Sequence, residues 1–592
     1  MDKRKFNFKL FTRLVRYVKP YKVNFLFVSF AAVLISFFSI FNQYLLKIAV
    51  DDFITPKDYE GLVTIISIML GVLLFQVTFQ FLFVFFTNLL GQKVVFDIRT
   101  KLFSKIISFK MSYYNKSSVG RLVTRTVNDM ETIASIFSQG LFMIVADLIL
   151  MFSVLSVMLI LSLKLSLIIF LVLPFILVAT RLFQMAMKVA FNQVRNEVAN
   201  LNSFVQERLS GIKEIQIFNR QLIEYNNFKK INERHKQAWL KTVWYNSIFF
   251  PISEISTSIT VGLIVWYAGF NNIAVENSIS LGTIFLFIQL SQMLFRPLRQ
   301  IADKFNTLQM GMVAANRVFK ILDTEEFVND FGKIKSKSIK GNILFDKVNF
   351  GYDKDNIIIK NLSLKIKKGE RIAIVGPTGS GKSTIIKLIL RFFELNSGKI
   401  NVDNVNIKDY SLKNLRSQIS LVSQDIFLFA DSIYNNISLF NKEISDKDVE
   451  AAANEIGILD FINNLPGGFN YNVKERGVML SEGQRQLISF LRAYVSNPKI
   501  LILDEATSSI DSRTEQLIQY ATNKIIEGKT SIIIAHRLST ILNADKILYL
   551  DNGMIKEFGS HKELIKIDNG YYKKLFEYQF QDSELIEQVI WN

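Results

Sequence analysis

The chain has 592 residues, of which 50% are hydrophobic and only 21% are charged, and its formal net charge is +18. This length predicts more than one domain, and the apolar content excludes an intrinsically disordered chain. Soluble proteins carry about 25% charged residues, so the composition favours a membrane protein. The absence of cysteine excludes disulfide scaffolds, cysteine nucleophiles, thiolate zinc sites and iron–sulfur clusters.

A short basic segment at the N-terminus precedes the first apolar run. Leu10, Leu14 and Val18 share one helical face, while the lysines and arginines lie largely elsewhere. This pattern predicts a helix lying in the membrane interface, with a solvated basic tail as the alternative. No cleavable signal peptide is expected, because no small-residue cleavage site follows a short apolar stretch.

Six long apolar segments follow. Each is about as long as a membrane-spanning helix, roughly 20 residues, or reaches that length with its flanks. Several runs of this length rarely occur together in the core of a soluble protein. The third and fourth segments are joined by little more than Lys164. The segments are Val23–Leu46, Leu62–Phe86, Leu141–Leu163, Leu165–Thr180, Ile248–Gly269 and Leu281–Phe295.

The placement of lysine and arginine predicts that both termini lie in the cytoplasm. The N-terminus and the two long connections, after the second and fourth spans, are basic, whereas the first and fifth loops are acidic on balance. Glycine and proline are sparse through residues 92–136 and 181–243, so the spans are expected to continue as long helices. Turns are expected at Ser117–Gly120 and Ser210–Gly211.

Asp147 and Glu254 lie within the third and fifth spans. An intramembrane carboxylate is costly and usually faces a bundle interior or an aqueous cavity. Two roles stay open for each residue: contact with a substrate or proton, or a hydrogen bond between helices. Together with Gln289, they are candidate residues of a substrate cavity.

The strongest local motif is G-x-x-x-x-G-K-S at Gly376–Ser383, between the predicted strand Ile372–Val375 and the predicted helix Thr384–Leu390. The glycines let backbone N–H groups approach phosphates, and a helix N-terminus favours negative charge. Lys382 can reach the β- and γ-phosphates, and Ser383 can bind Mg²⁺. The predicted ATP-binding residues of this motif are Gly376, Pro377, Thr378, Gly379, Ser380, Gly381, Lys382, Ser383 and Thr384.

A second element strengthens the nucleotide interpretation. Residues 499–504 read as an apolar strand that ends in Asp504, and Glu505 follows. An aspartate at a strand end can hold Mg²⁺ directly or through water. An adjacent glutamate can act as general base toward the attacking water. A solvated turn is the alternative for these two residues taken alone.

At this point the chain resembles the ABC exporters in their half-transporter form. The distinguishing motif is Leu480–Gln484, LSEGQ, which is similar to the family signature LSGGQ and departs from it at Glu482. Ser481 and Gly483, which in the family touch the γ-phosphate of ATP held by the opposite subunit, are retained. The signature residues implied by the resemblance are Leu480, Ser481, Glu482, Gly483 and Gln484.

Other positions match the family in the same order along the chain. Tyr352 matches the aromatic residue that stacks on adenine, and Gln424 matches the glutamine that links the Mg²⁺ and water site to the membrane domain. Asp511 lies in a segment that resembles the subunit-contact loop, and His536 resembles the switch histidine. The resemblance thus implies Glu505, His536 and Gln424 as catalytic residues. It implies Ser383, Gln424 and Asp504 as the Mg²⁺ site.

The resemblance covers roughly residues 10–580. It implies a membrane all-α six-helix domain with long intracellular helices, followed by an α/β P-loop ABC ATPase domain. The implied boundaries are 1–322 for the transmembrane domain with its elbow helix, 323–340 for a linker, 341–580 for the ATPase domain and 581–592 for a C-terminal tail. Coupling segments are expected near 113–122 and 210–218.

The implied function is ATP-driven export of a drug-like or lipid amphiphile across the cytoplasmic membrane, by alternating access in a dimer. The cofactors are ATP and Mg²⁺. The partner is a second copy or a paralogous half-transporter, with membrane lipid and no nucleic acid. A flippase for one dedicated lipid and an ATP-gated channel are the alternatives. Polar residues in the spans slightly favour neutral or cationic substrates, although Arg296 and Arg299 could bind lipid headgroups.

Overall fold

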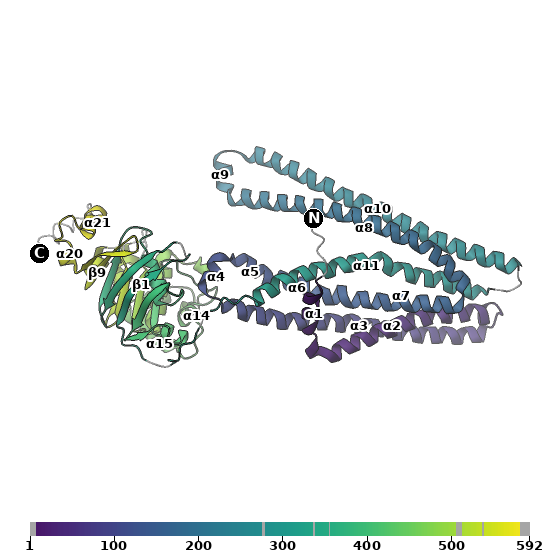
Figure 1. Ribbon diagram of the computed structural model, residues 1–592, viewed down its shortest axis with the longest axis horizontal. Coiled ribbons are helices and arrows are strands. Elements are labelled where there is room, and N and C mark those ends of the chain that lie inside the picture. The colour runs from purple at the N-terminus through teal and green to yellow at the C-terminus, as the bar shows by residue number, and fades with distance from the viewer. Residues whose placement is uncertain are drawn as a thin grey trace. The chain divides into compact units, whose positions relative to one another are not determined.

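The computed structural model describes residues 7–274, 279–328, 330–335, 338–353, 356–504, 512–535 and 538–580. The chain forms two compact units. The first comprises Met1–Ile107 and Val119–Thr324, and the second comprises Ser108–Ser118 and Glu325–Asn592. Figure 1 shows a helical first unit and a second unit built on sheets. Each unit is considered below by itself.

The first unit is all-helical. Within the described residues, six helices are long and apolar enough to cross a membrane, which confirms the predicted number of spans. Two π-helical turns, Ala49–Ile54 and Ile136–Leu141, interrupt or end long helices. The helices are α1 (Phe8–Arg16), α2 (Lys22–Ile48), α3 (Tyr59–Ile107), α5 (Val119–Thr126), α6 (Asn128–Ser135), α7 (Phe142–Leu161), α8 (Leu163–Ser210), α9 (Ile212–Ile217), α10 (Gln221–Ala274) and α11 (Leu281–Leu322).

Four of these helices are much longer than a bilayer requires. α3, α8, α10 and α11 have 49, 48, 54 and 42 residues, against roughly 20 for a span. The expected extension of the spans as helices is therefore confirmed. Breaks follow Lys116 and Ser210, where the sequence predicts turns.

The connection between the third and fourth spans differs from the expected one. The helix breaks at Ser162, which has extended backbone and accepts a hydrogen bond from the Leu165 amide at 3.4 Å. Lys164 lies in the first turn of α8 rather than in the connection. Serine is a favoured N-cap because its hydroxyl satisfies a free N–H of the first turn.

The N-terminal helix α1 is fixed to the end of α11. Leu14 is fully buried, and the Arg13 guanidinium forms two hydrogen bonds with the Asp323 carboxylate, at 2.6 and 2.7 Å. The same guanidinium lies 4.2 Å from the centre of the Phe319 ring. These contacts exclude a freely solvated tail for this segment.

The long helices are not packed evenly. α8 and α10 run side by side, and Figure 1 shows this pair diverging from α2, α3 and α7 toward α9. At the opposite end α7, α8, α10 and α11 share one buried cluster, which includes Met158, Ile169, Ile264 and Phe287. The α8–α10 pair is thus joined to α7 and α11 through this cluster.

The second unit contains two sheets. A four-stranded antiparallel sheet has the order β2-β1-β4-β5, and a six-stranded sheet has the order β10-β9-β3-β8-β7-β6, in which only β10 is antiparallel to its neighbour. The strands are β1 (Ile343–Phe350), β2 (Ile359–Ile366), β3 (Arg371–Val375), β4 (Ser397–Val402), β5 (Val405–Asn406), β6 (Ile419–Val422), β7 (Ile500–Asp504), β8 (Thr530–Ile534), β9 (Lys546–Asp551) and β10 (Met554–Gly559).

Helices cover the parallel strands, as their sequences require. Strands β7 and β8 are almost continuously buried and rich in isoleucine and leucine, which is typical of strands covered on both faces. The helices of this unit are α4 (Met111–Lys116), α12 (Lys382–Ile389), α13 (Leu412–Ser417), α14 (Ile433–Ser438), α15 (Asp446–Glu455), α16 (Leu459–Asn463), α17 (Glu482–Val495), α18 (Ser512–Ile526), α19 (Leu538–Leu542), α20 (His561–Leu564) and α21 (Tyr571–Phe580).

Gly311 of α11 tests how closely the helices of the first unit pack. A Cβ at this position would collide with the Ile136 side chain and lie 2.9 Å from the Thr132 carbonyl oxygen. We expect Gly311→Ala to separate the helices and to destabilise the protein by about 1–3 kcal/mol, seen as a lower unfolding temperature in detergent. Gly71→Ala is the control, because no atom of the described residues lies within 4 Å of its Cβ position. Equal unfolding temperatures for the two variants would contradict the close approach.

Candidate functional site

The predicted nucleotide residues gather at one edge of the six-stranded sheet. β3 leads into the loop Gly376–Ser383, β7 ends at Asp504, and Gln424 follows β6 by two residues. Because these strands are parallel, their carboxyl ends lie at the same edge. Open parallel sheets bind ligands at this edge.

The phosphate loop has a backbone that favours glycine. Gly376 and Gly381 have φ angles of 148° and 105°, which L side chains rarely adopt. A Cβ on Gly376 would also collide with the Leu550 carbonyl oxygen. Pro377, Thr378 and Gly379 are exposed, so the loop presents its backbone to solvent.

Lys382 lies across this loop. Its ammonium group donates hydrogen bonds to the carbonyl oxygens of Gly376 at 2.7 Å and Pro377 at 3.0 Å. Burial lowers the pKa of Lys382, and the charge of Asp504 acts to raise it, so the two predicted residues are electrostatic neighbours. Ser380 is 3% exposed, and its hydroxyl has no hydrogen-bond partner within the described residues. An unpaired buried donor beside a lysine suits an anionic ligand with acceptor oxygens.

Tyr352 lies beside the first turn of α12. Its hydroxyl is 3.3 Å from the Thr384 hydroxyl, and its ring packs edge-on against Phe393 with 5.0 Å between centroids. Ser383 is exposed in the same turn. The structure therefore brings Tyr352, Ser383 and Thr384 together beside the loop.

The signature motif forms the start of α17. Ser481 accepts a hydrogen bond from the Gln484 amide, and the Gln484 side chain accepts one from the Ser481 amide, at 3.2 and 2.9 Å. Leu480 and Gly483 are buried, whereas Ser481 and Glu482 are exposed. Glu482 occupies the first turn, where a negative charge stabilises a helix. Its departure from glycine is thus compatible with the fold.

Three predicted site residues, Glu505, Asp511 and His536, lie outside the described residues. Their roles stay predictions. Gln424 is described and exposed.

Arg492 and Asn436 are structural supports of the site that sequence analysis does not identify. The Arg492 Nε donates to the Asn436 carbonyl oxygen at 2.8 Å, and its Nη atoms donate to that of Phe427 at 3.3 and 3.4 Å. Asn436 is fully buried, and its side chain bonds both backbone groups of Phe429. Burial lowers the pKa of Arg492. Together they fix the segment after Gln424 to the signature helix α17. The one sequence signal for Arg492 is a charged residue that follows the largely apolar run Leu487–Leu491 of α17.

The first unit contains a polar cavity among α2, α3, α7 and α11, with a volume of about 580 Å³. The carboxylate of Asp147 forms an ion pair with the ammonium group of Lys304 at 2.5 Å. The Ser36 hydroxyl and the Asn42 amide oxygen are buried and have no partner within the described residues. The polar lining residues are Ser36, Ser39, Asn42, Gln43, Gln76, Gln80, Asp147, Arg296, Gln300 and Lys304.

Glu254 and Gln289 are not among the residues that line this cavity. Glu254 is exposed on α10 and has interactions of its own, and Gln289 is half-buried on α11. Sequence analysis does not identify Lys304, because it lies beyond the apolar run of the last span, where α11 continues without a break.

Replacement of Arg492 tests whether its hydrogen bonds hold the segment after Gln424 against α17. We expect Arg492→Ala to lower the free energy of unfolding by about 2–4 kcal/mol, because it leaves the carbonyl groups of Asn436 and Phe427 without their charged donor. Arg492→Lys should recover only part of the lost stability, since lysine lacks the planar guanidinium group that donates to both carbonyl oxygens. Chemical unfolding of the full chain measures the effect. Arg513→Ala, at an exposed position of α18, is the control, and equal stability of the alanine variants would refute the role.

Comparison with known proteins agrees with this geometry. The family model of the ABC transporter transmembrane region matches residues 25–298, and that of the ABC transporter matches residues 359–508. The chain is 35% identical over 578 residues to the "Uncharacterized ABC transporter ATP-binding protein YknV" of Bacillus subtilis, covering 97% of this chain and 95% of that one.

Two further relatives are similar over nearly their whole length. The chain is 36% identical to the "Putative ABC transporter ATP-binding protein exp8" of Streptococcus pneumoniae, covering 95% of this chain and 96% of that one. It is 34% identical to an ATP-dependent lipid A-core flippase of Haemophilus influenzae, covering 96% and 97%. With its phosphate loop, signature helix and six apolar helices in one polypeptide, the chain belongs to the ABC transporter family, as a half-transporter of the exporter type that couples ATP hydrolysis to transport.

Proposed function

We propose that two such subunits form an exporter of amphiphilic, drug-like or lipid substrates in the cytoplasmic membrane, working by alternating access. The observation that carries the proposal is the polar cavity around Asp147 and Lys304 among apolar helices, in a chain that also holds the phosphate loop. A polar cavity at membrane depth marks a substrate pathway.

The orientation follows from charge. The basic connections after α3 and α8 and the basic N-terminus favour the cytoplasmic side, which places both termini and the ATPase domain there. We assign the transmembrane domain to residues 1–322, the linker to 323–340, the ATPase domain to 341–580 and the tail to 581–592. Residues near 113–122 and 210–218 are assigned as coupling segments; the short helices α4 and α9 overlap them.

A half-transporter generally works as a dimer. The partner is a second copy or a paralogous half-transporter. The exposed Ser481 at the start of α17 suits contact with ATP held by the other subunit, because a helix N-terminus attracts phosphate. The α8–α10 pair, which diverges from α2, α3 and α7 toward α9 (Figure 1), offers further surface to that subunit. Asp511 is assigned to the subunit contact.

The residues present fit a nucleotide with magnesium. The unpaired Ser380 hydroxyl and the exposed loop backbone suit phosphate oxygens, and Lys382 supplies the cation. Ser383, Gln424 and Asp504 would hold Mg²⁺ through oxygen atoms, which this ion prefers. The bound ion neutralises charge on the phosphates.

The remaining site residues act on ATP and water. Tyr352 packs against adenine, and Lys382 binds the β- and γ-phosphates. Glu505 accepts a proton from the attacking water, Gln424 orients that water, and His536 contacts the γ-phosphate. These roles amount to positioning and charge stabilisation.

The charges of the residues that line the cavity restrict the class of substrate that it can bind. Asp147 and Lys304 neutralise each other, and Arg296 forms no ion pair within the described residues. The other polar lining residues are amides and hydroxyls, which hydrogen-bond neutral or anionic headgroups. Lys304 therefore shifts the sequence-based preference away from cationic substrates. A lipid substrate is also supported by the relative named as a lipid A-core flippase.

Replacement of Glu505 tests the ATPase mechanism. We expect Glu505→Gln to lower ATP turnover by about 10²–10⁴-fold, the usual contribution of a general base, while ATP still binds. Steady-state hydrolysis and retention of labelled ATP measure the two effects. Glu443→Gln, at an exposed position, is the control. Rapid hydrolysis by Glu505→Gln would sink the assignment.

The Asp147–Lys304 pair separates a binding role from a structural one. Asp147→Asn and Lys304→Gln should each destabilise the protein by about 1–3 kcal/mol, because each leaves a charge unpaired, and the double variant should recover stability. If the pair binds substrate, the double variant should still lose most stimulation of ATPase by lipids or drugs in liposomes. Full stimulation of the double variant would rule out a binding role, and stimulation of the native protein by one lipid alone would exclude a multidrug exporter.

A further inference from the structure

The linker that precedes the ATPase domain is bound at both ends by residues of the second unit. At its start, the Lys110 amide donates to the Glu326 carbonyl oxygen at 2.9 Å, and Phe109 pairs with Phe327 in an antiparallel bridge. The rings of Phe109 and Phe327 lie 6.0 Å apart. Phe109 follows α3 by two residues and precedes α4. This end of the linker is therefore held by the segment that leads from α3 into α4.

At its other end, the linker lies on the segment before α13. The Ile334 amide donates to the Asp409 carbonyl oxygen at 3.1 Å, and the Ser411 amide donates to the Ile334 carbonyl oxygen at 2.9 Å. A Cβ on Gly332 would collide with the Tyr410 carbonyl group, so the two backbones are in direct contact. Asp330 accepts a hydrogen bond from the Leu412 amide at 3.0 Å.

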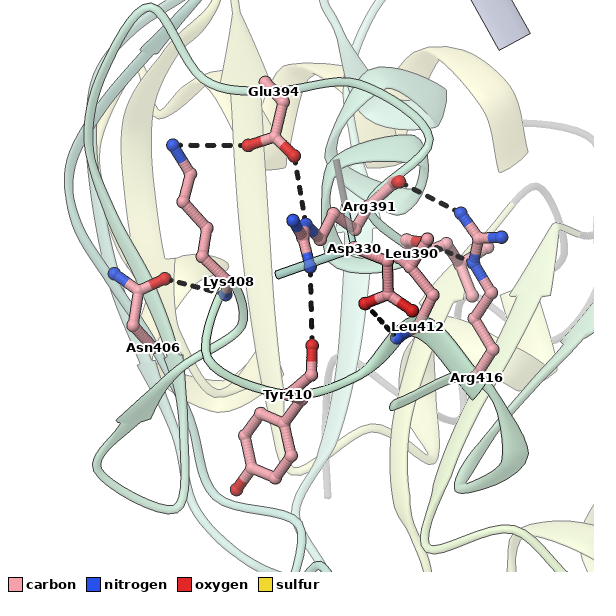
Figure 2. Close-up of polar contacts among 9 residues, drawn as sticks. All are labelled: Asp330, Leu390, Arg391, Glu394, Asn406, Lys408, Tyr410, Leu412 and Arg416. Atoms are coloured by element: carbon pink, nitrogen blue, oxygen red, sulfur yellow. Dashed lines mark hydrogen bonds and ion pairs between the residues drawn. The ribbon is translucent and has the colours of Figure 1, made fainter. Parts of the chain in front are cut away.

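Two arginines connect this segment to the phosphate-binding helix α12. Arg416 donates to the carbonyl oxygens of Leu390 at 3.1 Å and Arg391 at 3.0 Å, beyond the last residue of that helix. Arg391 donates to the Tyr410 carbonyl oxygen at 3.4 Å and to Glu394 at 3.0 Å. Figure 2 shows these contacts in one group, together with Asp330.

The arrangement brings together two like charges, of which Arg391 is buried and Arg416 is half-buried. Arg391 is 4% exposed and has a left-handed backbone with φ of 52°, which costs free energy in a residue other than glycine. Burial and the charge of Arg391 lower the pKa of Arg416, while Asp330 acts to raise it. The Glu394 carboxylate forms an ion pair with the Arg391 guanidinium, and a second one with the Lys408 ammonium group at 3.2 Å. The linker thus supplies a carboxylate that bonds the Leu412 amide and whose charge acts on Arg416.

We propose that Asp330 and Arg416 are positioning residues for ATP binding, and that residues 326–328 and 330–334 form a strap that holds the C-terminal end of α12. The N-terminal end of the same eight-residue helix begins at Lys382. A helix this short moves as a rigid body, so a shift at its C-terminal end displaces the N–H groups that face the phosphates. ATP affinity then depends on the docked linker, which is held beside α4 at its other end.

The test compares KM with kcat for ATP hydrolysis by the full chain in liposomes of phosphatidylethanolamine and phosphatidylglycerol. We expect Asp330→Ala and Arg416→Gln to raise the KM for ATP by about threefold to tenfold, with kcat within about twofold, because contacts equal in the ground and transition states act on KM alone. Arg416→Lys should restore part of the affinity. The double variant of Asp330→Ala and Arg416→Gln should raise KM by less than the product of the two separate fold-changes, since both residues act on one helix end.

Matched controls lie in the same regions. Asp346→Ala removes an exposed carboxylate of β1, and Phe331→Ala removes a linker ring that is 82% exposed. Both should leave KM unchanged, whereas Phe327→Ala, at the bound end of the strap, should raise it. If Arg416→Gln fails to fold, the KM values of the Asp330→Ala and Phe327→Ala variants still test the proposal. A lower unfolding temperature with unchanged KM for the Asp330 and Phe327 variants would overturn the proposal and leave the linker contacts as structural only.

Discussion

The need to hold concentrated negative charge at one point shapes the second unit. Triphosphate oxygens require many donors and few acceptors, which a parallel sheet supplies where its strands end and a helix begins. Lys382 lies at that point, with its ammonium group held by two loop carbonyl oxygens. The ends of β7 and β6, at the same edge of the sheet, contribute Asp504 and the segment that carries Gln424. Arginines below the surface then fix the loops and helices that bear these groups.

The first unit is governed by the opposite constraint, which is the cost of polar groups at membrane depth. Its polar side chains are accommodated by pairing or by facing a common cavity. Asp147 and Lys304 show the first solution, and the amides around them show the second. The same cavity retains buried oxygen atoms of Ser36 and Asn42 that have no partner within the described residues. Such groups remain available to hydrogen-bond a polar ligand.

Much of this architecture can be predicted from the sequence, because the sequence patterns that indicate it involve neighbouring residues. Apolar length gives the spans, and the glycine spacing of residues 376–383 gives the phosphate loop, since each depends on neighbouring residues only. The sequence places the connection between the third and fourth spans at Lys164, whereas the helix breaks at Ser162. A single capping residue between two apolar runs gives too weak a local signal to locate the break. The partners of Asp147 and Arg492 cannot be predicted from local sequence, because Lys304 and Asn436 lie far away in the chain. The same holds for the contact of Asp330 with the Leu412 amide. Those pairings depend on tertiary packing.

The one-residue connection at Ser162 has a mechanical consequence. With no slack between α7 and α8, the two helices cannot slide past each other at that end, so relative motion there is restricted to rotation. A helix of 48 residues is about 72 Å long at roughly 1.5 Å per residue. A rotation of about 5° at Ser162 would therefore move Ser210 by about 6 Å, so α8 acts as a lever that turns a small tilt into a large displacement at α9.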